Sequence, residues 1–349
     1  MSLSIGHKNI GLDHPPIIIA EMSGNHNQSL DRALKLVEVA YESGADGIKL
    51  QTYTADTMTL NIKEGNFKIK DPSSLWSGKN LYDLFKEAYT PWEWHAPIME
   101  RANQLGMICF SSPFDETAVD FLESLDVPAY KIASFENNHI PLIKKAAQTK
   151  KPLIISCGMA SLSQIEKAIH TAKSENCENI ILLKCTSNYP SEPINANIRT
   201  IRNMRDLFNL EIGLSDHTSG IGVALASIAF GSTIIEKHFT LDRNDGGVDS
   251  KFSLEPHELT NLVIESKRAW QALGRVNYGP TKNEKTSLIY RRSIYISKDI
   301  NVGEEFSSEN LKIIRPGDGA EPELFYEIIG KKAKKSFRRG NPLKLSDLL

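Results

Sequence analysis

Residues 15–52, PPIIIAEMSGNHNQSLDRALKLVEVAYESGADGIKLQT, indicate the fold class because they hold a complete strand–helix–strand unit. Residues 15–21 and 46–52 are short runs that are mostly apolar. Between them, residues 29–45 repeat apolar side chains at positions i, i+3 and i+4 and end near a glycine, as an amphipathic helix does. Two buried strands joined by a single helix predict a parallel sheet that helices cover.

The same alternation continues along most of the chain. DETAVDFLESLD (115–126) and SLSQIEKAIHTAKSE (161–175) begin with Asp and Ser, which are good helix N-caps. Eight such units fit a closed (β/α)8 TIM barrel better than an open doubly wound sheet, and no GxGxxG motif follows the first run. The expected strands are residues 15–21, 46–52, 107–112, 129–134, 152–158, 179–185, 210–216 and 232–238.

The pattern changes near residue 275, so we expect more than one domain. Residues 1–274 are predicted to form the α/β barrel and residues 275–290 a polar linker. Residues 291–349 offer short alternating runs and glycine turns with little helix, which is typical of a small β-rich module. A module of this size has little core of its own, so we expect it to pack on a barrel, either its own or a partner's.

Residues 53–106 interrupt the regular alternation of strands and helices, between the second and third predicted strands. WSGKNLYDLFKEAYTPWEWH (76–95) includes part of the second helix, and the remainder is an insertion on a strand-to-helix loop. Those loops surround the mouth of a TIM barrel, so this insertion is a candidate lid or specificity element.

Bulk composition excludes several classes of protein. The formal net charge is −2 and the sequence pI is near 6.5, which gives no general attraction to nucleic acid or to an anionic membrane. No apolar run approaches the roughly 20 residues that span a bilayer, and no secretory leader is recognisable. The four cysteines form no CxxC pair, so we expect buried free thiols in a cytoplasmic protein.

Polar side chains gather at the ends of the eight predicted strands. The carboxyl ends of parallel strands line the active site of a TIM barrel, so these side chains are expected to converge. The lysines, hydroxyls and amide suit a small phosphorylated acid, and no P-loop is needed for such a site. The candidates are Glu21, Lys49, Gln51, Ser111, Ser112, Lys131, Ser134, Glu136, Ser156, Asn188, Ser215, His217, Glu236 and His238.

Two histidines stand out because they end neighbouring predicted strands. His217 and His238 are placed to share one metal ion, with water and substrate oxygens in the remaining positions. General acid–base catalysis without metal, or hydrogen bonding at the rim of the barrel, are the alternatives. For His26 and His95, substrate contact and packing remain equally open.

Several motifs together resemble the sialic acid synthase family. They are IIIAEMSGNHNQSLDRA, YKIASFE, SCGMAS, CTSNYP, IGLSDHT and IEKHFTLDR, and they occur in order along nearly the whole chain. The tail SKDINVGEEFSSENLKIIRPGDG resembles the antifreeze-like (SAF, β-clip) domain that ends those enzymes. Members of the family condense phosphoenolpyruvate with an amino-sugar aldose to make nine-carbon nonulosonic acids.

The resemblance implies roles for individual residues. His217 and His238 would ligate a divalent ion, Mn²⁺ or Mg²⁺, and together with Glu21 and Glu136 they form the implied catalytic set. Arg315 would reach the sugar from another subunit, which implies a domain-swapped homodimer. The implied ligands of phosphoenolpyruvate are Lys49, Lys131, Ser134, Ser156, Asn188 and Ser215, and those of the sugar are Glu21, Asp249, Tyr290 and Arg315. One departure is SCGM in place of the more usual STGM, which puts Cys157 where a hydroxyl is expected.

The motifs EMSGNHNQSLDRA, KLQTYTADTMTL and WSGKNLYDLFKEAYTPWEWH look most like the pseudaminic acid branch of the family. The sugar would then be 2,4-diacetamido-2,4,6-trideoxy-L-altrose. An N-acetylneuraminate or legionaminic acid synthase, using N-acetylmannosamine or a related aldose, is the alternative. A Schiff-base aldolase using Lys49 or Lys131 is a distant one, and a glycan-binding or ice-binding scaffold is the least favoured.

Overall fold

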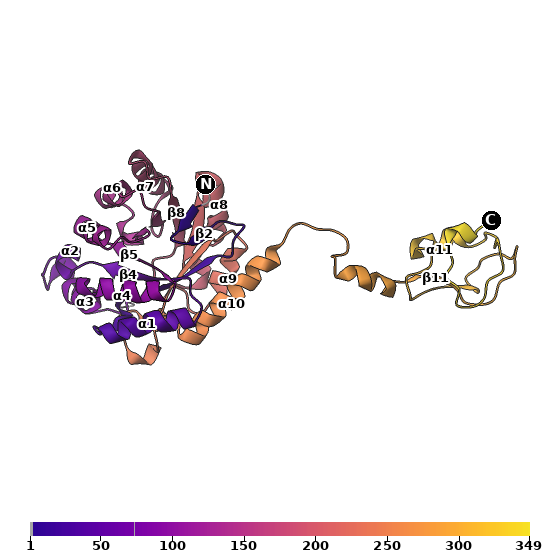
Figure 1. Ribbon diagram of the computed structural model, residues 1–349, viewed down its shortest axis with the longest axis horizontal. Helices are drawn as coiled ribbons and strands as arrows, with labels where there is room; N and C mark the ends of the chain where they lie inside the picture. The colour runs from indigo at the N-terminus through magenta and orange to yellow at the C-terminus, as the bar shows by residue number, and fades with distance from the viewer. Residues whose placement is uncertain (1–2, 73) are drawn as a thin grey trace. The chain divides into compact units, whose positions relative to one another are not determined.

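The structure is a computed structural model, and it describes residues 3–72 and 74–349. The chain divides into two compact units, residues 1–274 and residues 275–349 (Figure 1). Each unit has its own hydrophobic core. Within the described residues, no helix is both long and apolar enough to cross a membrane.

The first unit is a closed barrel of eight parallel strands, so the predicted (β/α)8 fold is confirmed. Around the barrel the strands follow the order β10-β3-β4-β5-β6-β7-β8-β9. Every strand of the barrel lies inside a run predicted from the sequence, except that β5 extends one residue beyond its run. The strands are β3 (Ile17–Glu21), β4 (Gly47–Thr52), β5 (Ile108–Pro113), β6 (Tyr130–Ile132), β7 (Leu153–Ser156), β8 (Ile180–Cys185), β9 (Glu211–Ser215) and β10 (Ile234–His238).

Helices surround the barrel, and local sequence explains where several of them begin (Figure 1). The side chain of Ser29 accepts a hydrogen bond from the backbone N–H of Arg32, and Asp115 does the same for Thr117 and Ala118. The principal helices are α1 (Leu30–Glu42), α4 (Trp92–Gln104), α5 (Glu116–Ser124), α6 (Ile140–Gln148), α7 (Leu162–Ser174), α8 (Arg199–Phe208), α9 (Gly222–Ile228) and α10 (Pro256–Leu273).

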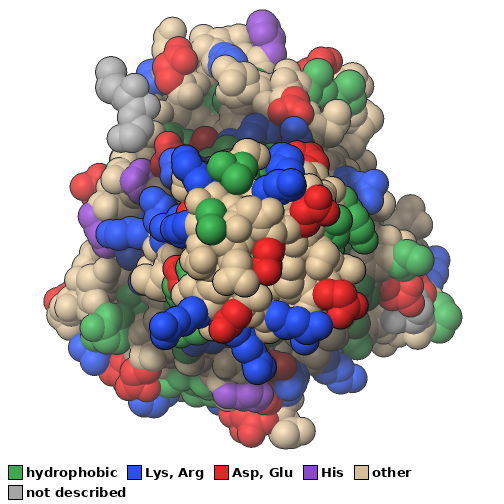
Figure 2. Space-filling view, turned by 90° about the vertical axis from the view of Figure 1, so that its right-hand side faces the viewer, with side chains coloured by type: hydrophobic (Ala, Val, Ile, Leu, Met, Phe, Trp, Pro, Cys, Tyr) green, Lys and Arg blue, Asp and Glu red, His purple; other side chains and the backbone are tan. Residues whose placement is uncertain are grey.

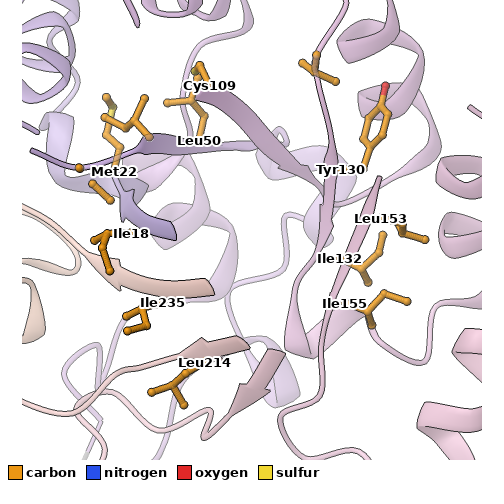
Figure 3. Close-up of a cluster of buried hydrophobic side chains, with 14 of the residues drawn as sticks. Ile18, Met22, Leu50, Cys109, Tyr130, Ile132, Leu153, Ile155, Leu214 and Ile235 are labelled. Carbon is orange, nitrogen blue, oxygen red and sulfur yellow. The ribbon is translucent and has the colours of Figure 1, made fainter. Parts of the chain in front are cut away.

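The core of the barrel has two layers because alternate strand residues face opposite sides. Outward side chains such as Ile18, Leu50 and Ile235 pack between the strands and the helices (Figure 3). Inward side chains near the amino ends of the strands, such as Ile19 and Phe110, form a separate apolar cluster.

A short hairpin, β1 (Leu3–Ile5) and β2 (Lys8–Ile10), adds Ile5 and Ile10 to the inner cluster. The sequence did not predict it, because a three-residue strand is too short to show an alternating pattern. The hairpin covers the amino-terminal end of the barrel with apolar side chains.

The insertion forms α2 (Ala55–Met58), α3 (Leu81–Ala88) and the approach to α4. His95 fixes it to the barrel: its Nδ1 donates to the Pro91 carbonyl, and its Nε2 accepts from the Thr52 hydroxyl at 2.8 Å. Thr52 in turn lies 2.6 Å from the hydroxyl of Ser111. Nε2 of His26 donates to the Thr90 hydroxyl at 3.2 Å, because its Nδ1 accepts from the backbone N–H of Gln28. Both imidazoles are fully buried, so the structure favours packing for these two histidines.

The second unit contains an antiparallel pair, β11 (Ser293–Ile296) and β12 (Leu311–Ile314), and the short helix α11 (Phe325–Ile328). A 3₁₀ helix, Glu284–Tyr290, lies in the segment expected to be a linker. The core of this unit includes Ile294, Ile296, Ile300, Phe306, Leu311, Ile328, Phe337 and Leu343.

Acid should destabilise the barrel through its two buried histidines. Burial lowers the pKa of His26 and His95 to about 4, from an ordinary value of 6.5. Between pH 6.5 and 4 the unfolded chain therefore binds more protons, and the free energy of unfolding falls as pH falls. Each histidine contributes up to about 1.4 kcal/mol per pH unit. Urea unfolding of wild type and His95→Gln across this range should show a shallower pH dependence in the variant. His170→Gln, at an exposed position on α7, should keep the wild-type slope, and equal slopes in all three proteins would contradict the prediction.

Candidate active site

The inward side chains at the carboxyl ends of the strands form a charged layer above the apolar cluster. Two lysines and two glutamates lie there, and each is at most 5% exposed. Hydroxyl, thiol and imidazole groups from other strands complete the layer. The inward-facing members are Glu21, Lys49, Gln51, Ser112, Lys131, Ser156, Cys185, Ser215, Glu236 and His238.

Each buried lysine is paired with a buried carboxylate. The Lys49 ammonium lies 2.7 Å from Oε2 of Glu21 and donates to the Ser112 hydroxyl at 3.1 Å. The Lys131 ammonium donates to both carboxylate oxygens of Glu236, at 2.8 and 2.9 Å. Burial alone would raise the pKa of Glu236, but the two ammonium groups lower it to about 2. The layer thus holds two positive charges at the base of the barrel mouth. Glu21 and Glu236 neutralise them in the absence of a bound anion.

His217 and His238 lie together beside this layer. Their ring centroids are 5.3 Å apart, and both side chains are buried. Nδ1 of His217 donates to the Thr186 carbonyl at 3.0 Å, so Nε2 carries the lone pair when the ring is neutral. Burial alone would lower the pKa of His217, but Cys185, whose sulfur lies 3.8 Å from Nδ1, raises it above its ordinary value. Nδ1 of His238 is buried without a hydrogen-bond partner among the described residues and lies 3.8 Å from Asp249 Oδ2.

These features fit a bound divalent cation. A carbonyl that fixes the tautomer of one imidazole is the usual outer support of a metal-binding histidine. A buried imidazole nitrogen without a partner is costly unless a ligand satisfies it. Burial holds the pKa of His238 well below its ordinary value, so the ring is neutral and able to coordinate.

A second group of potential metal ligands, Glu255, His257 and Glu258, stands at the start of α10. Its two carboxylates already form ion pairs with Arg243 and a capping box that begins the helix. The local helix geometry therefore accounts for this group without a metal ion.

Three predicted residues lie at or just after the carboxyl ends of β6 and β7. The Ser134 hydroxyl accepts from the backbone N–H of Gly158 at 3.2 Å. A Cβ at Gly158 would collide with the hydroxyls of Ser134 and Ser187, so glycine is needed for this close approach. The Ser156 hydroxyl and one carboxylate oxygen of Glu136 are buried and have no partner among the described residues. Burial raises the pKa of Glu136 to about 7. These groups are free to bind a substrate.

A cavity of about 500 Å³ opens beside the charged layer. Its polar side carries Ser23, Gln51, Glu136, His238 and Asp249. Ser23 donates to Asp249 and accepts from Gln51, which also donates to Glu21 at 2.8 Å. The other side is apolar, and much of it comes from the insertion: Met58, Ile69, Trp76, Leu81, Leu84 and Phe85. The Trp76 indole donates to the Val248 carbonyl at 3.0 Å and fixes this wall to the loop after β10.

The structure brings most of the predicted site residues of the barrel to this mouth, but three lie elsewhere. Asn188 is exposed, whereas the ring of its neighbour Tyr189 packs at a tilted angle against His217, with ring centroids 4.4 Å apart. Tyr290 and Arg315 lie in the second unit, where they line one pocket of about 460 Å³ with Arg291 and Arg292.

Some site residues had no role predicted from the sequence. Gln51, Ser112 and Glu236 were candidates only as polar strand ends, whereas in the structure Ser112 and Glu236 accept from the lysines and Gln51 donates to Glu21. Tyr189 and Ser23 carried no signal beyond their place in the motifs CTSNYP and EMSGNH.

Comparison with known proteins identifies the family of the chain. The model of the NeuB family matches residues 36–278, and the model of the SAF domain matches residues 291–349. The chain is 42% identical to the pseudaminic acid synthases of Campylobacter jejuni, over 97% of this chain and 98% of the relative, and of Helicobacter pylori, over 96% and 98%. A crystal structure of the N-acetylneuraminic acid synthetase from Leptospira borgpetersenii superposes with a TM-score of 0.74 at 33% identity, covering 83% of this chain and 96% of that one. The resemblance drawn from the motifs is confirmed: the chain belongs to the NeuB family and carries a SAF domain.

Proposed function

We propose that this chain is a pseudaminic acid synthase. It joins phosphoenolpyruvate, 2,4-diacetamido-2,4,6-trideoxy-L-altrose and water into pseudaminic acid and phosphate. One observation carries this proposal. Lys49 and Lys131, each ion-paired with a glutamate, lie beside the imidazoles of His217 and His238, next to a cavity with one polar and one apolar side. The identity to pseudaminic acid synthases over nearly the full chain supports the choice of sugar.

Phosphoenolpyruvate binds over the charged layer. Its phosphate and carboxylate meet the ammonium groups of Lys49 and Lys131, and the hydroxyls of Ser134, Ser156 and Ser215 add hydrogen bonds. Asn188 completes the set if the exposed loop that carries it moves onto the substrate. In a dry site, fixed charges of this kind contribute several kcal/mol, because they need no reorganisation during the reaction.

His217 and His238 hold the divalent cation, with Asp249 close to His238. Two imidazoles favour Mn²⁺ over Mg²⁺, because Mg²⁺ strongly prefers oxygen ligands. When bound, the ion supplies Lewis acidity toward the aldehyde oxygen of the sugar.

The remaining chemistry falls to the side chains around the substrates. C3 of phosphoenolpyruvate forms a bond to the aldehyde carbon, and the aldehyde oxygen gains a proton to become a hydroxyl. Water adds to C2, and phosphate leaves as the C2–O bond breaks and the new C2 hydroxyl loses its proton to form the keto group. Glu136, whose pKa of about 7 suits proton transfer at neutral pH, accepts the proton of the incoming water. Glu21 and Asp249 orient the hydroxyl and amide groups of the sugar.

The apolar wall of the cavity supports a deoxy sugar. The methyl group at C6 and the two acetamido methyls can lie against Leu84, Phe85 and Trp76 without burying an unpaired hydroxyl. A Schiff-base aldolase is disfavoured, because each lysine is ion-paired with a buried carboxylate and a nucleophilic lysine must be neutral and unpaired. Despite its burial, the carboxylates raise the pKa of Lys49, whereas burial lowers the pKa of Lys131.

Charge distribution supports the proposal of a domain-swapped homodimer. Residues 275–349 carry 15 Lys and Arg against 10 Asp and Glu, a formal charge of +5, whereas residues 1–274 carry 26 against 33, or −7. On the face shown in Figure 2, basic and acidic side chains are interspersed. In the proposed dimer the second unit of one copy brings Tyr290 and Arg315 to the sugar of the other.

Four buried free cysteines support a cytoplasmic setting.

The first test compares substrates. With phosphoenolpyruvate and Mn²⁺, the purified protein should release phosphate with 2,4-diacetamido-2,4,6-trideoxy-L-altrose at a kcat/KM about 10- to 100-fold above that with N-acetylmannosamine. Product mass identifies the acid formed. A preference for N-acetylmannosamine would favour the N-acetylneuraminate alternative, and a lysine adduct trapped by borohydride with pyruvate would favour the aldolase.

The second test concerns Glu136. As a general base it works when ionised, so wild-type kcat/KM should rise as pH rises through about 7. Glu136→Gln should lower kcat by about 10²- to 10⁴-fold and remove this limb of the pH profile. Glu116→Gln, at an exposed position on α5, is the control and should retain both. A wild-type-like profile in Glu136→Gln would show that another group takes the proton.

The third test concerns the second unit. Arg315→Ala should raise the KM for the sugar at least about tenfold while the KM for phosphoenolpyruvate stays within about twofold, because only the sugar contact is lost. Arg339→Ala in the same unit is the matched control. Light scattering should give twice the chain mass of 38.9 kDa. An unchanged sugar KM, or a monomer at full activity, would refute the swapped contact.

A further inference from the structure

Lys237 is a charged residue in a layer of apolar side chains. It lies on the outward face of β10, where Ile235 of the same strand and Leu214 of β9 pack against the surrounding helices (Figure 3). Only 1% of its surface is exposed. An ammonium buried in such a layer is unfavourable unless every donor is satisfied, so its position calls for a specific role.

All three hydrogens of this ammonium have acceptors in one short loop. Nζ donates to Oδ2 of Asp216 at 2.9 Å, to the Thr218 carbonyl at 2.6 Å and to the Gly220 carbonyl at 2.7 Å. The other carboxylate oxygen of Asp216 accepts from the backbone N–H of Thr218 at 2.9 Å. The backbone N–H of Asp216 donates to the Glu236 carbonyl on β10, also at 2.9 Å.

These contacts join the two segments that carry the histidines, on the outer side of the barrel. Asp216 and Thr218 are the chain neighbours of His217, and Lys237 is the chain neighbour of His238. The two imidazoles lie on the inner side of the barrel, and the ion pair lies on the outer side of the same two strands. A shift of either strand end would therefore have to break bonds to Lys237.

We propose that Lys237 and Asp216 are positioning residues that hold His217 and His238 at the separation which a shared divalent cation requires. This inference rests on the metal site of the proposed function. Neither residue touches the substrates, and both act through the backbone of the adjacent histidine. Outer-shell partners of metal ligands commonly affect metal affinity in this way.

A second ion pair on the same strand provides a control. Arg205 of α8 lies 2.9 Å from Glu211, the first residue of β9, at the end of the strand away from the histidines. Both pairs stabilise the same strand, but only the pair at Lys237 adjoins the imidazoles. A purely structural role would make the two pairs equivalent for metal binding.

The experiment measures binding of Mn²⁺ alone to the full-length, metal-stripped protein by electron paramagnetic resonance. Asp216→Asn and Lys237→Met should each raise the Kd for Mn²⁺ by about 10- to 100-fold. Glu211→Gln should leave the Kd within about twofold of wild type even if it lowers Tm. His217→Ala marks the complete loss of the site.

The outcomes distinguish a failure of the positioning role from a failure of the proposed metal site. If Lys237→Met does not fold, Asp216→Asn with a wild-type circular dichroism spectrum gives the answer. Wild-type Kd values in folded Asp216→Asn, together with loss of binding in His217→Ala, would overturn the positioning role and leave the metal site standing. Equal binding by wild type and His217→Ala, or no binding by either, would overturn the metal site itself.

Discussion

The buried ion pairs at the carboxyl ends of the strands are the constraint on which the site depends. Two ammonium groups cannot remain in the interior of a barrel without compensation, and Glu21 and Glu236 supply it. The same pairing keeps the cations inside a dry space, where their attraction for an incoming anion is strongest. The two layers inside the barrel both come from inward-facing positions, which are apolar near the amino ends of the strands and charged or polar near the carboxyl ends.

The barrel was predictable because its signal is repeated and local. Each unit, such as residues 15–52, shows two apolar runs and an amphipathic helix, and eight copies leave few alternative architectures. The gathering of Lys49, Lys131, His217 and His238 was also predictable, because all four occupy strand ends. Neither conclusion requires knowledge of contacts between distant parts of the chain.

The rest depended on contacts that a sequence does not display. The hairpin at Ile5 and Ile10 is too short to show a period, and the pairing of Lys131 with Glu236 joins residues 105 positions apart. Lys237 reads as an ordinary charge beside His238, and only its burial on the outer face reveals it. The insertion was recognised by its length, but its contribution of an apolar wall to the cavity appears only in three dimensions.

The apolar hairpin at the amino-terminal end of the barrel has a consequence for how substrates enter and products leave. Ile5 and Ile10 join the inner apolar cluster at that end, so the charged layer faces the carboxyl ends of the strands. Under the proposed function, both substrates and both products therefore pass through the same end of the barrel.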